Sequence, residues 1–162
     1  MSSSIVESKT SMELVGTYLR LLRARFSGTN DSIPWQWSPN KEESAIHIES
    51  GSNELEELMD SKPSIFVERS SIVYPSVALG NHAGTHLASG SRYFYTTPSG
   101  QMVIDCISRS KGESSLIGDT VANYLVMSGN LLRMYYGLRS ITPITILPSQ
   151  PWEKDDRNYI TR

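Results

Sequence analysis

The sequence predicts an α+β fold, in which two helices pack on one face of a mainly antiparallel sheet that contains a long hairpin. Two long stretches carry apolar residues at helical spacing, and the segment between them is rich in β-branched and aromatic residues. The chain has 162 residues, a length that suits one domain. We therefore expect a single domain over residues 1–162, with residues 1–10 and 149–162 as flexible arms.

The first helix is expected from about Ser11 to Phe26. Thr10 and Glu13 have the spacing of a capping box, in which each side chain satisfies a free backbone N–H of the first turn. The apolar residues of this stretch recur at helical spacing and form one stripe. They are Leu14, Val15, Tyr18, Leu21, Leu22 and Phe26.

An irregular segment follows at residues 28–44, where glycine, asparagine and proline interrupt any regular pattern. Trp35 and Trp37 lie inside it. Two tryptophans in a loop need burial, either against the core of their own chain or against a partner.

Short strands are predicted at residues 45–49, 64–68 and 71–74, because β-branched and aromatic residues dominate them. Residues 92–97 and 101–109 predict a hairpin, with Pro98-Ser99-Gly100 as its turn. Together these strands supply the predicted sheet.

A second helix is predicted from about Ser114 to Tyr136, with Leu116 and Leu131 among the residues assigned to its buried face. Gly118 and Gly129 each weaken a helix by about 1 kcal/mol relative to alanine, so they predict a kink or close packing. A last strand is expected at residues 141–147, at a sheet edge because Pro143 interrupts it. The remaining residues, with Trp152 and Arg157 among several charged side chains, predict an exposed arm.

Composition excludes several classes of protein. The net charge of −2, from 15 basic and 17 acidic side chains, argues against a dedicated nucleic-acid binder. One cysteine excludes an intrachain disulfide framework and a cysteine-based zinc cluster. The apolar runs are too short for a membrane span, and the first residues lack the features of a secretory signal. We expect no membrane association.

The segment His82-Ala83-Gly84-Thr85-His86 resembles the start of the H-x-G-T-H-x-D signature of metal-dependent cyclase and formamidase hydrolases. In that family the histidines and the aspartate bind a divalent metal that activates water. Here Ala88 stands in the aspartate position, and the further histidine of the signature is absent. The alternative interpretation is a loop over Pro75–Ser91 whose histidines make solvent or subunit contacts. The sequence favours the loop, and therefore no catalytic residue, metal or cofactor.

The order of the predicted elements resembles that of the tail-terminator and neck proteins of tailed bacteriophages. The passage Gly100-Gln101-Met102-Val103-Ile104-Asp105-Cys106, followed by the Gly112-Glu113 turn and a long helix, carries most of this likeness. The matching stretches are Met12–Phe26, Ser64–Tyr74, Ser91–Ser108, Glu113–Tyr136 and Ile141–Leu147.

The resemblance implies a virion structural protein without enzymatic activity, assembled in the host cytoplasm. It implies a homo-oligomeric ring, usually of six subunits, that caps the tail tube and joins it to the head connector, while DNA passes through the lumen without specific binding. An adaptor or stopper of the same neck is the first alternative, and a small metal-dependent hydrolase using His82 and His86 is the second. Under the ring hypothesis we expect contacts with neighbouring proteins at Trp35, Trp37, His82, His86, Trp152 and Arg157.

Overall fold

The computed structural model describes residues 6–28, 33–51, 62–73, 82–85, 88–90, 92–94, 99–136, 144–153 and 155–162. The chain divides into two compact units. Residues 1–68 and 103–162 form the larger unit, and residues 69–102 form the smaller one. The single domain expected from the chain length stays a prediction.

A five-stranded sheet has the strand order β1-β2-β5-β7-β6. Its strands are β1 (His47–Ser50), β2 (Ser64–Val73), β5 (Ser99–Ser108), β6 (Gln150–Trp152) and β7 (Asp155–Thr161). β1 runs parallel to β2, whereas β7 runs antiparallel to both β5 and β6. The sheet is therefore mixed and mostly antiparallel, as predicted.

The long pair of strands in this sheet is formed by β2 and β5, each ten residues in length. β2 is one continuous strand where the sequence predicted two. Its first four residues are fully buried, and the buried end of β5 comprises residues 105–108. The buried ends of β2 and β5 therefore lie side by side in the part of the sheet that belongs to the larger unit.

The predicted pairing of residues 92–97 with residues 101–109 is wrong. β4 (Arg92–Phe94) pairs antiparallel with β3 (His82–Thr85) in a separate two-stranded sheet. A turn signal such as Pro98-Ser99-Gly100 encodes only a local reversal, whereas β2 offers β5 a long partner with a buried face. Burial therefore decides the partner of β5.

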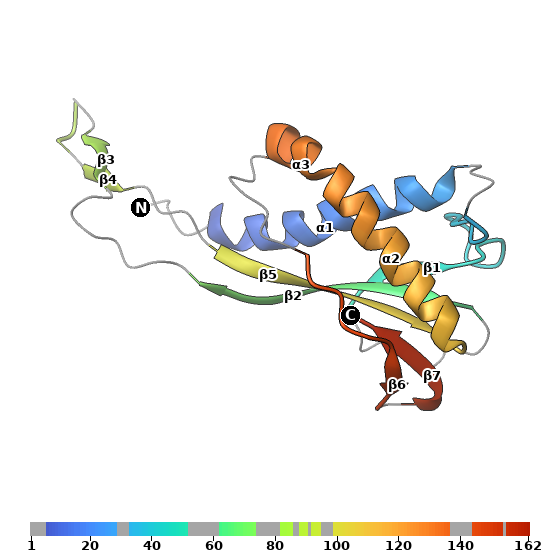
Figure 1. Cartoon of the computed structure of the whole chain (residues 1–162). Helices are drawn as coiled ribbons and strands as arrows, with labels where there is room; N and C mark the ends of the chain where they lie inside the picture. Colours follow the sequence, from blue (N-terminus) through green and yellow to red (C-terminus); the bar gives the residue numbers. More distant parts are fainter. Residues whose placement is uncertain are drawn as a thin grey trace. The chain divides into compact units, whose positions relative to one another are not determined.

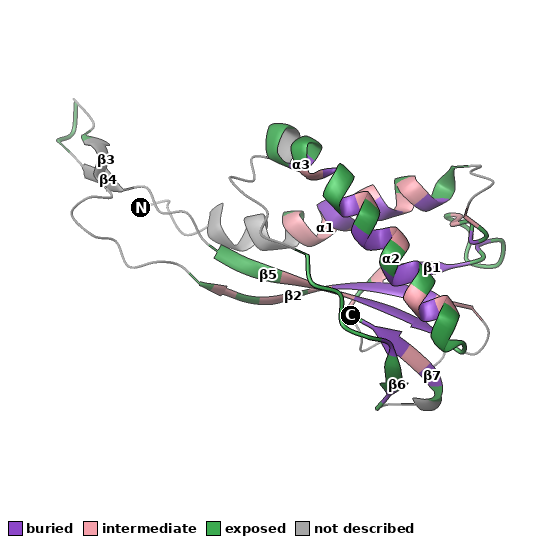
Figure 2. Ribbon diagram, in the orientation of Figure 1, coloured by how far each residue is buried: buried purple, intermediate pink, exposed green. Residues whose placement is uncertain are grey.

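The helices lie on one face of the sheet, as Figure 1 shows. They are α1 (Val6–Ser27), α2 (Lys111–Met127) and α3 (Gly129–Tyr136). Figure 2 shows buried residues on the sides of α1 and α2 that face the sheet and exposed residues on their outer sides. The predicted fold class is confirmed.

Two helix boundaries differ from the prediction. α1 begins at Val6, so the interpretation of residues 6–10 as part of an arm is wrong; this stretch contains no glycine or proline to end a helix. The second helix begins three residues early, because the Ser110 side chain accepts a hydrogen bond from the backbone of Glu113 and caps it. It is divided at Ser128, where the sequence predicted a kink near Gly129.

Gly118 shows the close packing that its position in the helix predicted. A Cβ atom at this residue would lie 2.7 Å from Cγ2 of Thr161 in β7. Beside it, the Ser114 hydroxyl donates to the Cys106 carbonyl at 2.9 Å and shares a 2.8 Å hydrogen bond with the Thr161 hydroxyl. α2 therefore lies close against β5 and β7.

The interpretation of residues 149–162 as a flexible arm is wrong. Trp152 of β6 and Ile160 of β7 are buried in a core cluster with Phe66 and Ile107. The apolar residues of this stretch were hard to recognise in the sequence, because many charged residues surround them. Only some positions of a strand face the core, so charged residues can occupy the others. The last residue, Arg162, donates two hydrogen bonds to the buried Asp105 carboxylate, at 2.6 and 2.9 Å.

The predicted strand at residues 141–147 does not form where the structure describes it. Residues 144–149 have no strand ladder, and residues 141–143 lie outside the described residues. The backbone N–H of Leu147 donates to the carbonyl of Arg162 at 2.8 Å, and Pro148 next to it has no N–H to donate. This part of the chain, which follows residue 143, therefore enters the sheet only at β6.

Candidate assembly surface

Two of the three tryptophans expected at a subunit contact, Trp35 and Trp152, are buried within the chain itself. Trp35 is 8% exposed, and its indole Nε1–H donates to Oε1 of Glu113 at 2.8 Å. Trp152 is 8% exposed and belongs to the core cluster. Of the two alternatives left open for Trp35, burial against its own chain is the one observed, and a contact of Trp35 or Trp152 with another protein stays a prediction.

Trp37 and Arg157 are less buried than Trp35 and Trp152. Trp37 is half-buried, and the guanidinium carbon of Arg23 lies 5.2 Å from the centre of its ring, a cation–π distance. Arg157 is an exposed residue of β7. A contact between either residue and another protein stays a prediction.

The histidine segment is only partly described. The backbone of His82 belongs to β3, and His86 lies outside the described residues. Among the residues that the structure describes, no group of three or more His, Cys, Asp or Glu side chains is placed to hold a metal ion.

Burial, followed by the nearby Asp105 carboxylate, strongly raises the pKa of the Cys106 thiol, which therefore stays protonated.

Glu113 joins the irregular segment to the start of α2. Its carboxylate accepts hydrogen bonds from Trp35 and from the hydroxyl of Ser108, while its backbone N–H is capped by Ser110. An acidic side chain in the first turn also suits the positive end of the helix dipole. The sequence assigned Glu113 to the helix start but gave no sign that Trp35 would be its partner.

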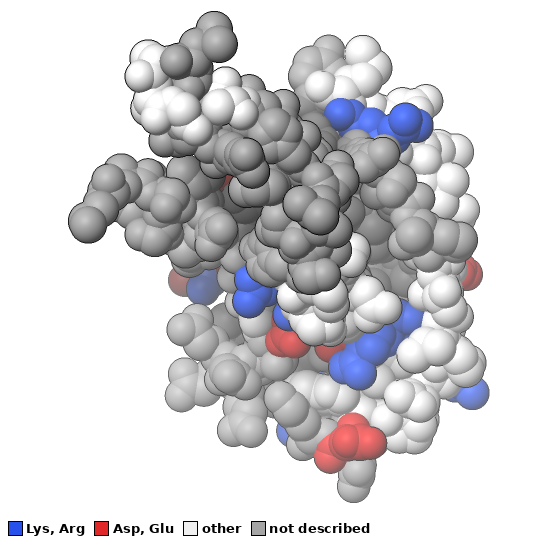
Figure 3. Space-filling view, turned by 90° about the vertical axis from the view of Figure 1, so that its left-hand side faces the viewer, with Lys and Arg blue, Asp and Glu red and all other residues white. Residues whose placement is uncertain are grey.

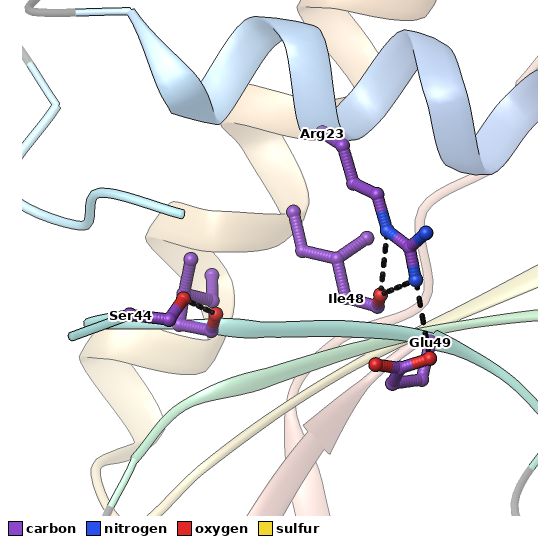
Figure 4. A network of polar contacts seen from close by, with 5 residues as sticks. Arg23, Ser44, Ile48 and Glu49 are labelled. Atoms are coloured by element: carbon purple, nitrogen blue, oxygen red, sulfur yellow. Dashed lines mark hydrogen bonds and ion pairs between the residues drawn. The ribbon is translucent and has the colours of Figure 1, made fainter. Parts of the chain in front are cut away.

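The β1 edge of the sheet is closed by side chains, as Figure 4 shows. The guanidinium of Arg23 donates to the Ile48 carbonyl from Nε at 3.1 Å and from Nη2 at 2.7 Å, and Nη2 also contacts Glu49 at 3.1 Å. The Ser44 hydroxyl donates to the Ile46 carbonyl at 2.6 Å. These carbonyls are therefore occupied and poorly available to an added strand.

The opposite edge is protected in a different way. β6 comprises only three residues, and its central residue, Pro151, has no N–H to donate. Short edge strands and proline are common means of preventing edge-to-edge pairing. Strand addition is therefore disfavoured at both edges of the five-stranded sheet.

The outer face of α2 and α3 exposes large apolar side chains. Met127 is 82% exposed, Met134 79% and Val126 67%. The prediction that Leu116 and Leu131 belong to the buried face is wrong, because they are 53% and 42% exposed. The buried face is narrower than the sequence suggested, since serine and glycine occupy several of its positions.

A second group of exposed apolar side chains lies just before β6. Ile144, Ile146 and Leu147 are 37%, 44% and 47% exposed. Neighbouring exposed apolar residues are typical of surfaces that contact another protein. The sequence gave no separate sign of either group, because Leu116 and Leu131 share the helical spacing of the buried residues and residues 141–147 were assigned to a strand.

Among the described residues drawn in Figure 3, charge gives no comparable surface on that face. In Figure 3, basic and acidic side chains of the described residues lie in separate small groups, and neither sign forms a continuous patch on that face. No helix among the described residues is long and apolar enough to cross a membrane. The apolar groups are therefore the main candidates for contact surfaces.

No protein-family model, no curated protein and no solved structure matches this chain.

Proposed function

We propose that this chain is a structural protein of a tailed-phage virion, a ring-forming tail terminator that caps the tail tube and joins it to the head connector. The observation that carries the proposal is the presence of two separate groups of exposed apolar side chains, one on α2 and α3 and one at residues 144–147. A ring subunit needs two different contact surfaces, because each copy meets one neighbour on each side.

The order of elements supports the same proposal. The N-terminal helix, the strand β2, the strand β5 and the helix that follows β5 keep the order that the resemblance implies. The hairpin within Ser91–Ser108 and the described part of the strand at Ile141–Leu147 do not form, so the support is partial. The closed sheet edges direct the contacts between subunits to side-chain surfaces and away from strand pairing.

The balance of charge suits a channel that DNA must traverse. The chain carries 15 basic and 17 acidic side chains. A strongly basic wall would bind phosphates by counterion release and retain the DNA, whereas a near-neutral wall binds it weakly. We therefore expect no specific DNA binding.

The oligomeric state of the purified chain tests the proposal. Light scattering and negative-stain imaging should give a closed ring, with six subunits as the expected number. Ile146→Lys places a charge in the 144–147 group and should reduce the ring fraction, whereas Gln101→Lys, a charge added at an exposed polar position, should leave it unchanged. A chain that forms no ring, alone or with tail-tube protein, would contradict the proposal.

An adaptor or stopper of the same neck would use the same features. A ring of twelve subunits that binds portal protein would favour the adaptor over the terminator. The hydrolase alternative has no support among the described residues, and metal analysis of the purified protein tests it directly.

A further inference from the structure

Two methionines are the most exposed large apolar residues that the structure describes. Met127, the last residue of α2, is 82% exposed, and Met134 in α3 is 79% exposed. Of the six methionines in the chain, the structure describes one further side chain, that of Met102, which is half-buried. The thioether groups of Met127 and Met134 are therefore accessible to an oxidant in solution.

The single cysteine does not compete with these methionines for an oxidant. Cys106 is 2% exposed and lies in the buried end of β5. Burial raises the pKa of its thiol, which stays protonated, whereas a thiol reacts with peroxides as an accessible thiolate. A peroxide that meets the folded chain is therefore left to react with the exposed thioethers.

We infer that Met127 and Met134 are oxidation sites, and that their conversion to methionine sulfoxide weakens the contact made by the outer face of α2 and α3. Hydrogen peroxide is the oxidant. Its O–O bond breaks, one oxygen atom forms an S=O bond with the thioether sulfur, and the other oxygen leaves as water. The sulfur is oxidised and the peroxide is reduced, so the reaction needs no further reactant.

Oxidation changes the chemistry of this surface while the core keeps its composition. Methionine is a flexible apolar side chain, whereas its sulfoxide is polar and carries an oxygen that accepts hydrogen bonds. A polar group that enters an apolar contact loses its hydration, and this loss opposes the contact unless a donor replaces the water. Because Met127 and Met134 are exposed in the folded chain, their oxidation should leave the fold unchanged.

The inference rests on the proposed function, because the outer face of α2 and α3 is one of the two groups that the ring is proposed to use. It adds a covalent modification that hinders assembly of the free subunit. Methionine sulfoxide is reduced again by methionine sulfoxide reductases, so the modification is reversible.

Peroxide treatment of the purified full-length chain tests the inference. Peptide mass mapping should show that Met127 and Met134 gain oxygen before Met102 does. Light scattering should then show that the association constant of the ring contact falls about tenfold, because a polar group enters an apolar contact. A methionine sulfoxide reductase should restore the ring fraction, and circular dichroism checks that the oxidised chain stays folded.

The double variant Met127→Leu/Met134→Leu keeps apolar side chains of similar volume, so it should form rings and retain them in peroxide. Met102→Leu is the matched control, since it removes a half-buried methionine and should leave the chain as sensitive as the parent. Equal sensitivity of the double variant and the parent, or oxidation of Met102 ahead of the other two, would overturn the inference.

The same measurements separate this inference from the proposed function. If rings form and persist after both methionines are oxidised, the inference is wrong and the proposed function stands. If no ring forms before peroxide is added, the proposed function is wrong, and the inference falls with it.

Discussion

His47 is a titratable residue at the start of β1, and it is almost completely buried. It is 8% exposed. Burial, followed by the positive charge of Lys62, lowers the pKa of its imidazole below the ordinary value of 6.5, although Glu49 acts in the opposite direction. The folded protein therefore holds this histidine neutral over a pH range in which the unfolded chain takes up a proton.

We expect the free energy of unfolding to fall as the pH falls below 6.5, partly because of His47. In that range the unfolded chain binds more protons at this site than the folded chain, so stability rises with pH and is lost on acidification. Urea denaturation at a series of pH values measures the slope. His47→Gln removes the titrating group and should flatten the slope below pH 6.5; equal slopes for both proteins would contradict the prediction.

At the scale of elements, the β1 edge depends on a side chain from α1. Arg23 donates two hydrogen bonds to the Ile48 carbonyl and also forms an ion pair with Glu49. The first interaction covers the edge, whereas the second adds little, because exposed ion pairs are worth about 0–1 kcal/mol. The hydrogen bonds to Ile48 and the ion pair with Glu49 can therefore be separated by substitution at Glu49.

Arg23→Ala should increase concentration-dependent association, because it uncovers a backbone carbonyl on an edge strand. Light scattering over a concentration series measures the increase relative to the parent chain. Glu49→Ala is the control, since it removes the ion pair and leaves both bonds to Ile48. If the two variants associate equally, the edge is not protected by Arg23.

Gly118 shows how a close contact can override helix propensity. Alanine would favour the helix by about 1 kcal/mol. Its Cβ would nevertheless lie 2.7 Å from Cγ2 of Thr161, whose side chain is buried and bonded to Ser114. The contact distance leaves no room for the added methyl group.

Gly118→Ala should therefore destabilise the protein, by about 1–2 kcal/mol after the propensity gain is subtracted. Thr161→Ser removes the obstructing methyl group and keeps the hydroxyl. In that background Gly118→Ala should be neutral or stabilising, and urea denaturation of the four proteins of this double-mutant cycle measures the coupling. Equal costs in both backgrounds would show that the methyl group is not the cause.

At the scale of the whole molecule, residues 149–162 complete the sheet and the core. They supply β6, β7, two residues of the core cluster and the Arg162 partner of Asp105. Each large apolar side chain buried there contributes about 1.5–3 kcal/mol. The contributions of Trp152 and Ile160 together therefore reach the lower end of the whole stability of a domain, which is about 5–15 kcal/mol.

Deletion of residues 149–162 should therefore abolish cooperative unfolding. Circular dichroism and urea denaturation of the truncated chain measure this loss. Trp152→Ala is a milder test, with an expected cost of about 3–5 kcal/mol and retention of the fold. A truncated chain that unfolds with the parent midpoint would show that this stretch is an accessory arm after all.

The candidate surface was harder to predict than the fold. Helical spacing placed Tyr18, Leu22 and Phe26 correctly in the core, yet the same spacing assigned Leu116 and Leu131 to a buried face that does not contain them. Spacing gives the period of a helix but not the width of the face that a neighbouring sheet covers. Only the packing of α2 against β7 shows which apolar residues remain exposed.

The sequence by itself determined the fold class, the two helical regions and most of the strands, because hydrophobic period and helix caps act over a few residues. The tertiary structure decided the partners. It paired β5 with β2 and β7, joined Trp35 to Glu113, and built the charged C-terminal stretch into the core. These contacts link residues far apart in the chain, and they depend on which surfaces are buried together, a property that no local pattern of residues encodes.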